Sequence, residues 1–263
     1  MRGRAMAEGA TAGRFHGRVG FVTGAASGLG RATAIGLARE GAKLLLFDRD
    51  AAGLAETAAD CPGALTFAGD VTAAADLDAA TEAAARLGPV TLLAAAAGML
   101  GPAKPVEQVT EAEWDRLFAV NVKGSWLTVR ALLPAMRAAG GGAMVLFAST
   151  AGLAGSATLP AYSASKGAVV MLTRSLALSH APEGIRVNCV CPGSIETPML
   201  EATFASAGDA TARATREAAF RARHPLGRFG RPGEVAEAVL YLLSDGAGFT
   251  TGVALPVDGG RLA

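Results

Sequence analysis

The sequence predicts an α/β protein in which helices cover both faces of a parallel, seven-stranded sheet. Short apolar runs alternate with helical segments along the 263 residues, and this alternation is typical of parallel strands joined by helical crossovers. Several runs, such as Leu44 to Phe47, are continuously apolar, as expected of strands buried on both faces. A glycine-rich segment lies between the first strand and the first helix.

The predicted strands are short runs rich in β-branched and other apolar residues, bounded by turn-forming residues. They cover residues 19–23, 43–48, 64–68, 91–95, 143–148, 186–191 and 254–257. We expect the crossovers between them to be right-handed.

Glycine, proline and capping residues mark the helix boundaries. Gly41 is a good residue to follow a helix, and Pro232 suits a first helical turn. Thr110 and Glu113 form a capping-box pattern at the start of a helix that extends to residue 138. The helices are predicted over residues 29–40, 51–59, 73–87, 110–138, 162–180, 210–223 and 232–243.

The composition excludes several classes of protein. Apolar residues make up 51% of the chain and charged residues 18%, which is typical of a globular domain. A net charge of +1 gives no broad basic field, so we expect no nucleic-acid partner. The longest apolar stretch, residues 92–100, is far shorter than the roughly 18–20 residues of a membrane-spanning helix. We expect a cytoplasmic protein with no membrane partner.

The chain is predicted to form one domain. We expect residues 1–17 to be a flexible N-terminal leader, because they lack the apolar region of a signal peptide. Residues 18–263 would form a single domain, with a substrate lid at about 193–231, after a strand's carboxyl end. Cys61, Cys189 and Cys191 are too few for a disulfide framework. No cluster of Cys and His completes a metal site, so no metal is predicted.

The glycine-rich segment predicts a dinucleotide-binding loop. Gly24 permits a tight turn, Gly28 lets the backbone approach a pyrophosphate, and Gly30 lets the helix pack closely. The helix N-terminus adds free N–H groups and a partial positive charge. An ordinary turn between strand and helix is the alternative, which an acidic residue downstream disfavours. The cofactor contacts expected in the loop are Gly24, Ser27, Gly28, Leu29 and Gly30.

Asp48 is that acidic residue, at the end of the second predicted strand. A carboxylate there can accept hydrogen bonds from both hydroxyls of the adenosine ribose, and it would repel a 2′-phosphate. We therefore expect NAD as the cofactor. Arg49 is an opposing signal, because a guanidinium can bind the 2′-phosphate of NADP. NADP remains the less favoured alternative.

Tyr162 and Lys166 suggest an acid–base site. They lie four residues apart at the start of a predicted helix, so they share one face. A neighbouring ammonium favours the phenolate, and we expect it to lower the pKa of Tyr162. A proton donor and acceptor nearer neutrality is what ketone reduction needs. A surface pair without function is the alternative reading of these two residues alone.

Taken together, these motifs resemble the short-chain dehydrogenase/reductase family, in its single-domain branch of roughly 250 residues. The resemblance covers residues 18–262 and implies a Rossmann-type doubly wound fold. The matching motifs, in the family's order, are the glycine-rich loop, Gly69-Asp70-Val71, Asn121-Val122, Ser149, the Tyr162/Lys166 pair, Pro192-Gly193 and residues 257–260.

The resemblance implies a role for each catalytic residue. Tyr162 would be the general acid and base, and Lys166 would lower its pKa and hold the nicotinamide ribose. Ser149, 13 residues before the tyrosine, would hydrogen-bond the substrate oxygen. Asn121 would hold a water that relays protons from Lys166 to solvent, although it could also kink its helix.

The resemblance also implies the remaining cofactor contacts. Asp70 should meet the adenine with Val71 beside it, and Ile195 and Thr197 should meet the carboxamide and pyrophosphate. The cofactor contacts expected outside the loop are Asp48, Arg49, Asp70, Val71, Ala95, Gly98, Tyr162, Lys166, Pro192, Ile195 and Thr197.

The chain departs from the family after the fourth predicted strand. The family usually has Asn-Asn-Ala-Gly there, whereas this chain has Ala95-Ala96-Ala97-Gly98. The asparagines normally tie strands together beside the cofactor, so the change puts the affinity for the cofactor in doubt. The backbone contacts of Ala95 and Gly98 can survive.

The favoured function is an NAD-dependent oxidoreductase that interconverts a secondary alcohol and a ketone. A catalytically silent dinucleotide-binding sensor or scaffold, and an NADPH-dependent 3-oxoacyl reductase, are the alternatives. An enoyl reductase is disfavoured, since such relatives space tyrosine and lysine more widely. An epimerase or dehydratase of sugar nucleotides is disfavoured because its larger carboxyl-terminal domain is absent.

The composition of the lid suggests a class of substrate, and the resemblance suggests an assembly. The apolar residues Met199, Leu200 and Phe204 of the lid, with Met99 and Leu100, suggest a small or medium apolar alcohol. The resemblance implies a homotetramer, assembled through the helices over 110–138 and 162–180 and the carboxyl-terminal segment. The three histidines, His16, His180 and His224, are scattered and need no function.

Overall fold

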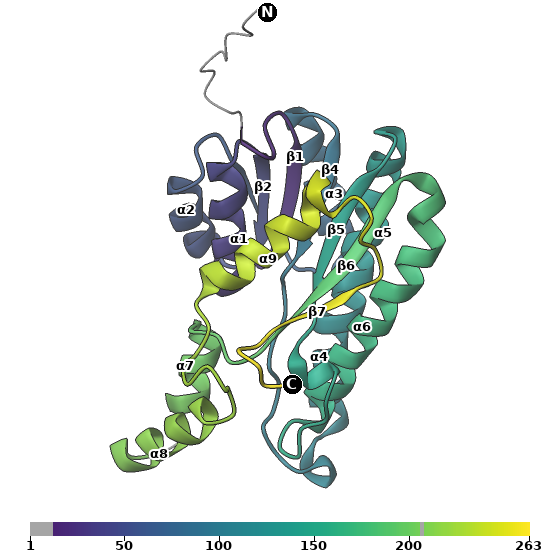
Figure 1. Cartoon of the computed structure of the whole chain (residues 1–263). Helices are drawn as coiled ribbons and strands as arrows, with labels where there is room; N and C mark the ends of the chain where they lie inside the picture. Colours follow the sequence, from purple (N-terminus) through teal and green to yellow (C-terminus); the bar gives the residue numbers. More distant parts are fainter. Residues whose placement is uncertain (1–12, 206–207) are drawn as a thin grey trace, which may run out of the picture.

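The computed structural model describes residues 13–205 and 208–263 (Figure 1). These residues contain a seven-stranded sheet in the order β3-β2-β1-β4-β5-β6-β7, and each pair of neighbouring strands is parallel. From β1 the chain builds the sheet outward through β2 and β3, and then crosses back to place β4 on the other side of β1. The predicted doubly wound fold is confirmed.

The predicted strands are all present, and their ends differ from the prediction by at most one residue. The strands are β1 (Val19–Thr23), β2 (Lys43–Asp48), β3 (Leu65–Ala68), β4 (Val90–Ala95), β5 (Gly142–Phe147), β6 (Ile185–Pro192) and β7 (Ala254–Val257). Every residue of β1 is buried, as expected of a central strand with helices on both faces.

The α-helices of the described part are α1 (Gly28–Arg39), α2 (Ala51–Ala59), α3 (Ala74–Ala84), α4 (Glu111–Phe118), α5 (Gly124–Ala138), α6 (Pro160–His180), α7 (Pro198–Ala205), α8 (Ala210–Arg221) and α9 (Pro232–Leu243). Short 3₁₀ turns cover Ala85–Leu87, Val106–Gln108, Thr150–Gly152, Ala181–Glu183 and Asp245–Ala247.

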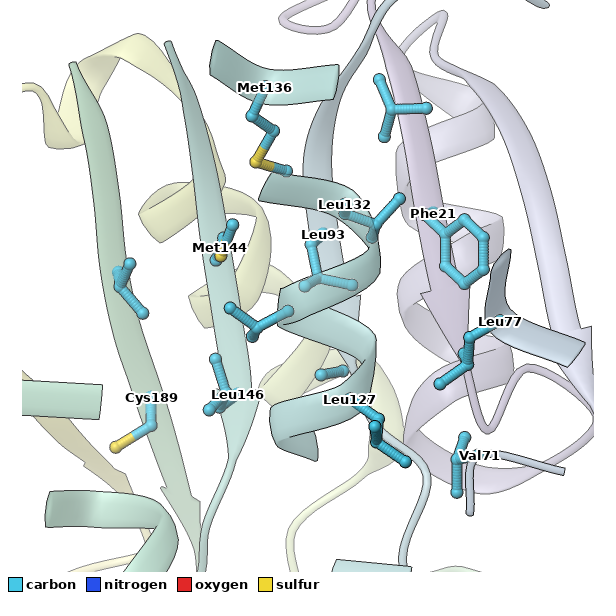
Figure 2. Close-up of a cluster of buried hydrophobic side chains, with 14 of the residues drawn as sticks. Phe21, Val71, Leu77, Leu93, Leu127, Leu132, Met136, Met144, Leu146 and Cys189 are labelled. Atoms are coloured by element: carbon cyan, nitrogen blue, oxygen red, sulfur yellow. The ribbon is translucent and has the colours of Figure 1, made fainter. Parts of the chain in front are cut away.

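On one face of the sheet, α3, α5 and α6 bury a continuous apolar layer. Figure 2 shows Phe21 and Leu93 of the sheet beside Leu77 of α3 and Leu132 of α5. Each of these side chains is at most 1% exposed. Complete burial of one such side chain contributes about 1.5–3 kcal/mol, so this layer fixes α5 and α6 firmly on the sheet.

On the opposite face, α1, α2 and α9 cover a second apolar layer. Leu44 and Leu46 of β2 point into it, whereas Leu45 lies in the first layer, because side chains alternate across a strand. Leu37 of α1 and Val239 of α9 meet the strands there. Helices α1 and α9 run across the sheet side by side (Figure 1).

Residues 13–17 correct the prediction of a flexible leader. Phe15 is fully buried in the second apolar layer, and its N–H donates to the carbonyl oxygen of Glu40 at 3.1 Å. The Arg14 guanidinium pairs with the Glu40 carboxylate. These contacts hold the segment at the end of α1. Its release would withdraw Phe15 from the core and expose apolar surface, which is unfavourable. The remainder of the expected leader, residues 1–12, lies outside the described residues.

The helix predicted over residues 110–138 is divided in two. Thr110 and Glu113 form the predicted capping box at the start of α4. A π-helical turn, Ala119–Lys123, separates α4 from α5. Single π turns are frequent at functional sites, and this one contains Asn121.

Candidate active site

The candidate site lies at the carboxyl edge of the sheet, where the strand order reverses between β1 and β4. Such a switch point is where an open α/β sheet leaves a crevice for a ligand. Helix α1 begins here, after the glycine-rich loop, with Ser27 as its N-cap residue. The free N–H groups of a helix N-terminus favour a phosphate at this position.

The loop depends on two of its glycines in particular. Gly24 has φ +67°, and a Cβ atom there would lie 2.7 Å from the backbone nitrogen of Ala97. A Cβ atom at Gly30 would overlap the carbonyl oxygen of Gly24. Any larger residue would push the loop away from β4 or from α1. The structure therefore provides the close, side-chain-free cradle that a pyrophosphate requires.

Asp48 ends β2 and points its carboxylate at this loop. One oxygen accepts a hydrogen bond from the N–H of Ala26 at 3.1 Å, and the other accepts one from Asp50 N at 3.1 Å. Arg49 is exposed beside it. The carboxylate thus has a fixed orientation next to the phosphate cradle, where a ribose would follow.

Asp70 and Val71 follow β3 at the same edge. The Asp70 carboxylate accepts hydrogen bonds from the Thr72 N–H and hydroxyl, each at 2.8 Å, and these bonds hold its pKa below the usual range. Val71 is 8% exposed and packs where a Cβ atom on Gly124 would lie. Asp48, Asp70 and Val71 therefore lie at the ends of neighbouring strands.

The catalytic candidates converge from two elements. Tyr162 and Lys166 lie in the first turns of α6, and Ser149 follows β5. The Lys166 Nζ donates to the carbonyl oxygen of Phe147 at 2.7 Å and lies 5.8 Å from the centre of the Tyr162 ring. Ser149 accepts a hydrogen bond from Ala151 N at 3.1 Å, and a Ser149–Tyr162 hydrogen bond favours the phenolate.

The pKa of Tyr162 differs from the expectation. Burial raises it to about 12, and the hydrogen bond with Ser149 opposes part of that rise. Burial also lowers the pKa of Lys166 to about 8. Desolvation penalises the charged form of both groups, and this effect exceeds the attraction that we expected from the ammonium. In the protein alone, Tyr162 is therefore a neutral phenol at neutral pH, whereas Lys166 stays mainly protonated until the pH exceeds about 8.

Asn121 lies at the centre of the hydrogen-bond network of the site. Its amide oxygen accepts from Met99 N at 2.9 Å, and its Nδ2 donates to Met99 O at 3.0 Å and to Ser165 Oγ at 3.1 Å. These bonds tie the π turn to the segment after β4 and to α6. The Asn121 side chain is fully buried. The π turn therefore directs this amide toward the interior of the protein.

Gly98 keeps the space between these groups open. A Cβ atom on Gly98 would lie 3.3 Å from both Asn121 Oδ1 and Lys166 Nζ. The nearby family asparagines are replaced here, yet the strands remain joined, since Ala97 N donates to the Thr23 hydroxyl at 3.2 Å. Ala95 is 3% exposed and packs in the core.

A cavity of about 1050 Å³ connects these groups with the segment over residues 193–231. Ser149, Tyr162 and Lys166 line it together. The expected cofactor contacts that line it are Leu29, Gly98, Tyr162, Lys166, Pro192, Ile195 and Thr197. Thr197 also faces the glycine-rich loop, because a Cβ atom on Gly28 would lie 3.5 Å from its methyl group.

The apolar residues expected around a substrate divide into two groups. Leu100, Met199 and Leu200 line the cavity. Phe204 instead packs inside the segment against Phe220 and Phe229, with ring centres 5.5 and 5.7 Å apart. It therefore stabilises the position of α7 and α8.

His224 supports a segment that lines the site, although it does not line the cavity itself, and the sequence did not single it out. It is 3% exposed; its Nε2 lies 3.0 Å from Ser194 N and its Nδ1 lies 2.9 Å from Phe220 O. An imidazole with its proton on Nδ1 satisfies both backbone groups. His224 thus joins the end of α8 to the segment that precedes Ile195. No local sequence pattern points to so distant a partner.

Known proteins resemble this chain in sequence and in structure. A family model described as enoyl-(acyl carrier protein) reductase matches residues 24–261. The 2-(S)-hydroxypropyl-CoM dehydrogenase 3 of Xanthobacter autotrophicus is 44% identical over 257 residues, which are 95% of this chain and 98% of the relative. The cis-4-hydroxycyclohexanecarboxylate dehydrogenase of Sinomonas cyclohexanicum is 42% identical, with the same two coverages. The crystal structure of levodione reductase has a TM-score of 0.90 at 37% identity, covering 94% of this chain and 98% of that one.

Proposed function

Because the chain belongs to the short-chain dehydrogenase/reductase family, we propose that it interconverts a secondary alcohol and a ketone with NAD. The observation that carries the proposal is the convergence of Ser149, Tyr162 and Lys166 in one cavity at the switch point of the sheet. The names of the two curated relatives describe secondary alcohols. The same reaction is assigned here to this chain.

Each catalytic residue has a role that follows from its position. Tyr162 accepts the hydroxyl proton of the alcohol during oxidation and returns it during reduction. Ser149 hydrogen-bonds the same oxygen and stabilises the charge that develops on it. The bound NAD supplies the hydride acceptor. Lys166, held by Phe147 O, keeps a positive charge near the phenol whenever it is protonated, and it is placed to hold the nicotinamide ribose. We assign Asn121 to the relay of protons from Lys166 to solvent.

The cofactor is assigned to the groups at the carboxyl edge of the sheet. The side-chain-free cradle formed by Gly24, Gly28 and Gly30 fits a pyrophosphate. The fixed carboxylate of Asp48 fits the adenosine ribose and disfavours a 2′-phosphate, which is why NAD is proposed over NADP. We assign the adenine to Asp70 and Val71, and the nicotinamide end to Pro192, Ile195 and Thr197. Arg49, exposed beside Asp48, is the residue most able to weaken this preference.

We also propose a homotetramer. Trp126 of α5, and Met171 and Leu178 of α6, are exposed apolar side chains on the helices expected to form one interface. Phe249, which precedes β7, is fully exposed on the carboxyl-terminal side. Burial of these side chains between subunits would remove apolar surface from water. Light scattering at micromolar concentration tests the assembly, and a monomer would contradict it.

We propose a cytoplasmic location, because the cysteines of the described part of the chain are free thiols. Cys61, Cys189 and Cys191 are buried free thiols in the described part of the chain, as expected where thiols stay reduced. No helix among the described residues is long and apolar enough to span a membrane.

The decisive experiment is NADH production from a panel of secondary alcohols, with Tyr162→Phe beside the wild type. We expect kcat to fall by about a hundredfold or more when this general base is removed. Tyr241→Phe is the matched control, because Tyr241 is the other tyrosine of the chain and is 44% exposed on α9. Undiminished activity of Tyr162→Phe would overturn the assignment. NAD binding without turnover of any alcohol or ketone would support a silent binding protein instead.

A 3-oxoacyl reductase that uses NADPH is the second enzymatic alternative. The pair of Tyr162 and Lys166 serves that reduction equally well. The fixed Asp48 carboxylate argues against its cofactor. Faster reduction of a 3-oxoacyl thioester with NADPH than of any simple ketone with NADH would favour this alternative.

A further inference from the structure

The part of the cavity formed by α8 and the carboxyl-terminal segment is basic. Arg216 of α8, Arg223 just beyond α8 and Arg261 near the carboxyl terminus line the same cavity as Ser149 and Tyr162. Arg261 lies 45 residues after Arg216 and 38 residues after Arg223 in the sequence. We propose that Arg223 and Arg261 bind an anionic group, a carboxylate or sulfonate, on the alcohol substrate. This inference rests on the proposed function and names its substrate class.

Neither Arg223 nor Arg261 forms an ion pair within the described part of the chain. Among the described residues, no carboxylate lies within ion-pair distance of either guanidinium, whereas Arg213 pairs with Glu201 and Glu217 at 2.8 and 2.9 Å. An arginine with five donors and no carboxylate partner is suited to bind the oxygens of a carboxylate or sulfonate.

The carboxylates near these arginines accept hydrogen bonds from backbone N–H groups. Asp209, which also lines the cavity, accepts a hydrogen bond from Ala212 N at 2.8 Å and caps α8. Asp258 accepts from Gly260 N and Leu262 N, each at 3.0 Å. Both carboxylates thus stabilise the segments that carry the arginines.

Each guanidinium has a defined position. Arg223 lies over the Phe220 ring, with its central carbon 4.5 Å from the ring centre. Arg261 is half-buried, in the turn held by Asp258. Burial and the nearby Arg223 lower the pKa of Arg261, and the Asp258 carboxylate opposes part of this shift. Both arginines line the same cavity. A bound anion would relieve this repulsion.

The proposal is consistent with the rest of the cavity wall. Leu100, Met199 and Leu200 provide apolar surface, and Tyr162 and Ser149 provide the groups that act on the hydroxyl. A substrate that fits has a secondary hydroxyl, an apolar middle and an acidic group. The proposal adds an acidic group to the small or medium apolar alcohol that the sequence suggests.

The test compares two alcohols that differ in charge: 4-hydroxycyclohexanecarboxylate and its uncharged carboxamide. We expect the wild type to show a KM about tenfold or more lower for the acid, the size of one charge-assisted hydrogen bond. Arg223→Gln and Arg261→Gln should each raise KM for the acid and leave kcat/KM for the carboxamide within about twofold. Arg213→Gln is the matched control, since Arg213 lies on α8 but does not line the cavity.

Competitive inhibition by an acid that cannot react separates recognition of the anion from the chemical step. Cyclohexanecarboxylate, which lacks the hydroxyl, should inhibit wild-type turnover of the carboxamide competitively and inhibit Arg261→Gln at least about tenfold less. Equal KM values for acid and carboxamide in the wild type, or equal losses for both alcohols in the variants, would overturn the inference and leave the proposed function intact. Failure of the enzyme to oxidise any alcohol would overturn both.

Discussion

Lys166 lies 5.8 Å from the centre of the Tyr162 ring but donates its 2.7 Å hydrogen bond to the backbone of β5. The ammonium is therefore fixed by the sheet. This arrangement fits the proposed role of Lys166 in holding a cofactor ribose, and it gives less direct stabilisation of the phenolate than the spacing alone suggested. The first two predictions follow from it.

Tyr162 should remain a phenol far into the alkaline range in the absence of NAD. Burial raises its pKa to about 12, so its proton should leave only as the pH approaches that value. The chain contains two tyrosines, and the difference between the ultraviolet titrations of wild type and Tyr162→Phe isolates one of them. Circular dichroism at each pH verifies the fold. A Tyr162 phenolate that forms below about pH 9 without NAD would show that Lys166 outweighs burial.

Lys166 should make the stability of the protein depend on pH. Its pKa is about 8 in the folded state against 10.5 for the ordinary side chain, so the unfolded state binds more protons between these values. Stability from this group therefore increases as the pH rises from about 8 to 10.5, by on the order of 3 kcal/mol. Urea unfolding of wild type and Lys166→Met should show a difference that changes over this window. A constant difference would contradict the shift.

Asp48 should determine the choice of cofactor. In Asp48→Ser the carboxylate that repels a 2′-phosphate is gone, and Arg49 remains beside the site. We expect kcat/KM with NADP to rise by about tenfold or more, since removing one unfavourable charge contact is worth about 1.4 kcal/mol. Steady-state rates with NAD and NADP measure it. If kcat/KM with NADP rose equally in the double variant Asp48→Ser/Arg49→Ala, the Arg49 guanidinium would not contribute to binding of the 2′-phosphate.

Gly24 should tolerate no side chain. Gly24→Ala places a methyl group 2.7 Å from Ala97 N at φ +67°, which adds a collision with the segment after β4 to the strain of a left-handed backbone. Gly63→Ala is the matched control, because φ is +76° there and no atom lies within 4 Å. We expect Gly63→Ala to cost about 1 kcal/mol, and Gly24→Ala to cost more and to weaken NAD binding as measured by calorimetry. Equal effects of the two variants would argue against the close approach.

Ala95→Asn should not restore what the family asparagine provides. Ala95 is 3% exposed in the apolar layer. An amide buried without hydrogen bonds costs about 1–3 kcal/mol. We expect a lower melting temperature and no gain in affinity for NAD. A more stable variant would mean that the segment after β4 rearranges to pair the amide.

The sequence predicted those features that depend on local patterns. The strands were located because apolar runs of four to eight residues, bounded by turn-forming residues, are too short for most helices. The capping box of Thr110 and Glu113 was located because it depends on two residues only three positions apart. The positions of the glycines and of Tyr162 and Lys166 were equally local. These features define the edge of the sheet where the site lies.

The features that the sequence missed depend on distant partners. The π turn exists around Asn121 because its amide binds Met99, 22 residues away. His224 reaches Ser194 across 30 residues, and Phe15 enters a core built by other segments. The direction of the Tyr162 pKa shift required knowledge of burial. No pattern along the chain reports these tertiary contacts.

Helix α8 has no buried residue between Ala210 and Arg221, in contrast to α5 and α6. A helix held by so little apolar contact opens locally with a small free energy, so its amide protons should exchange with solvent sooner than those of the sheet. A ligand that bridges Arg223 and Arg261 would slow that exchange, because it would bind only the ordered segment. Substrates would then differ partly in how far each one orders α8. Local opening of α8 would limit the rate of product release.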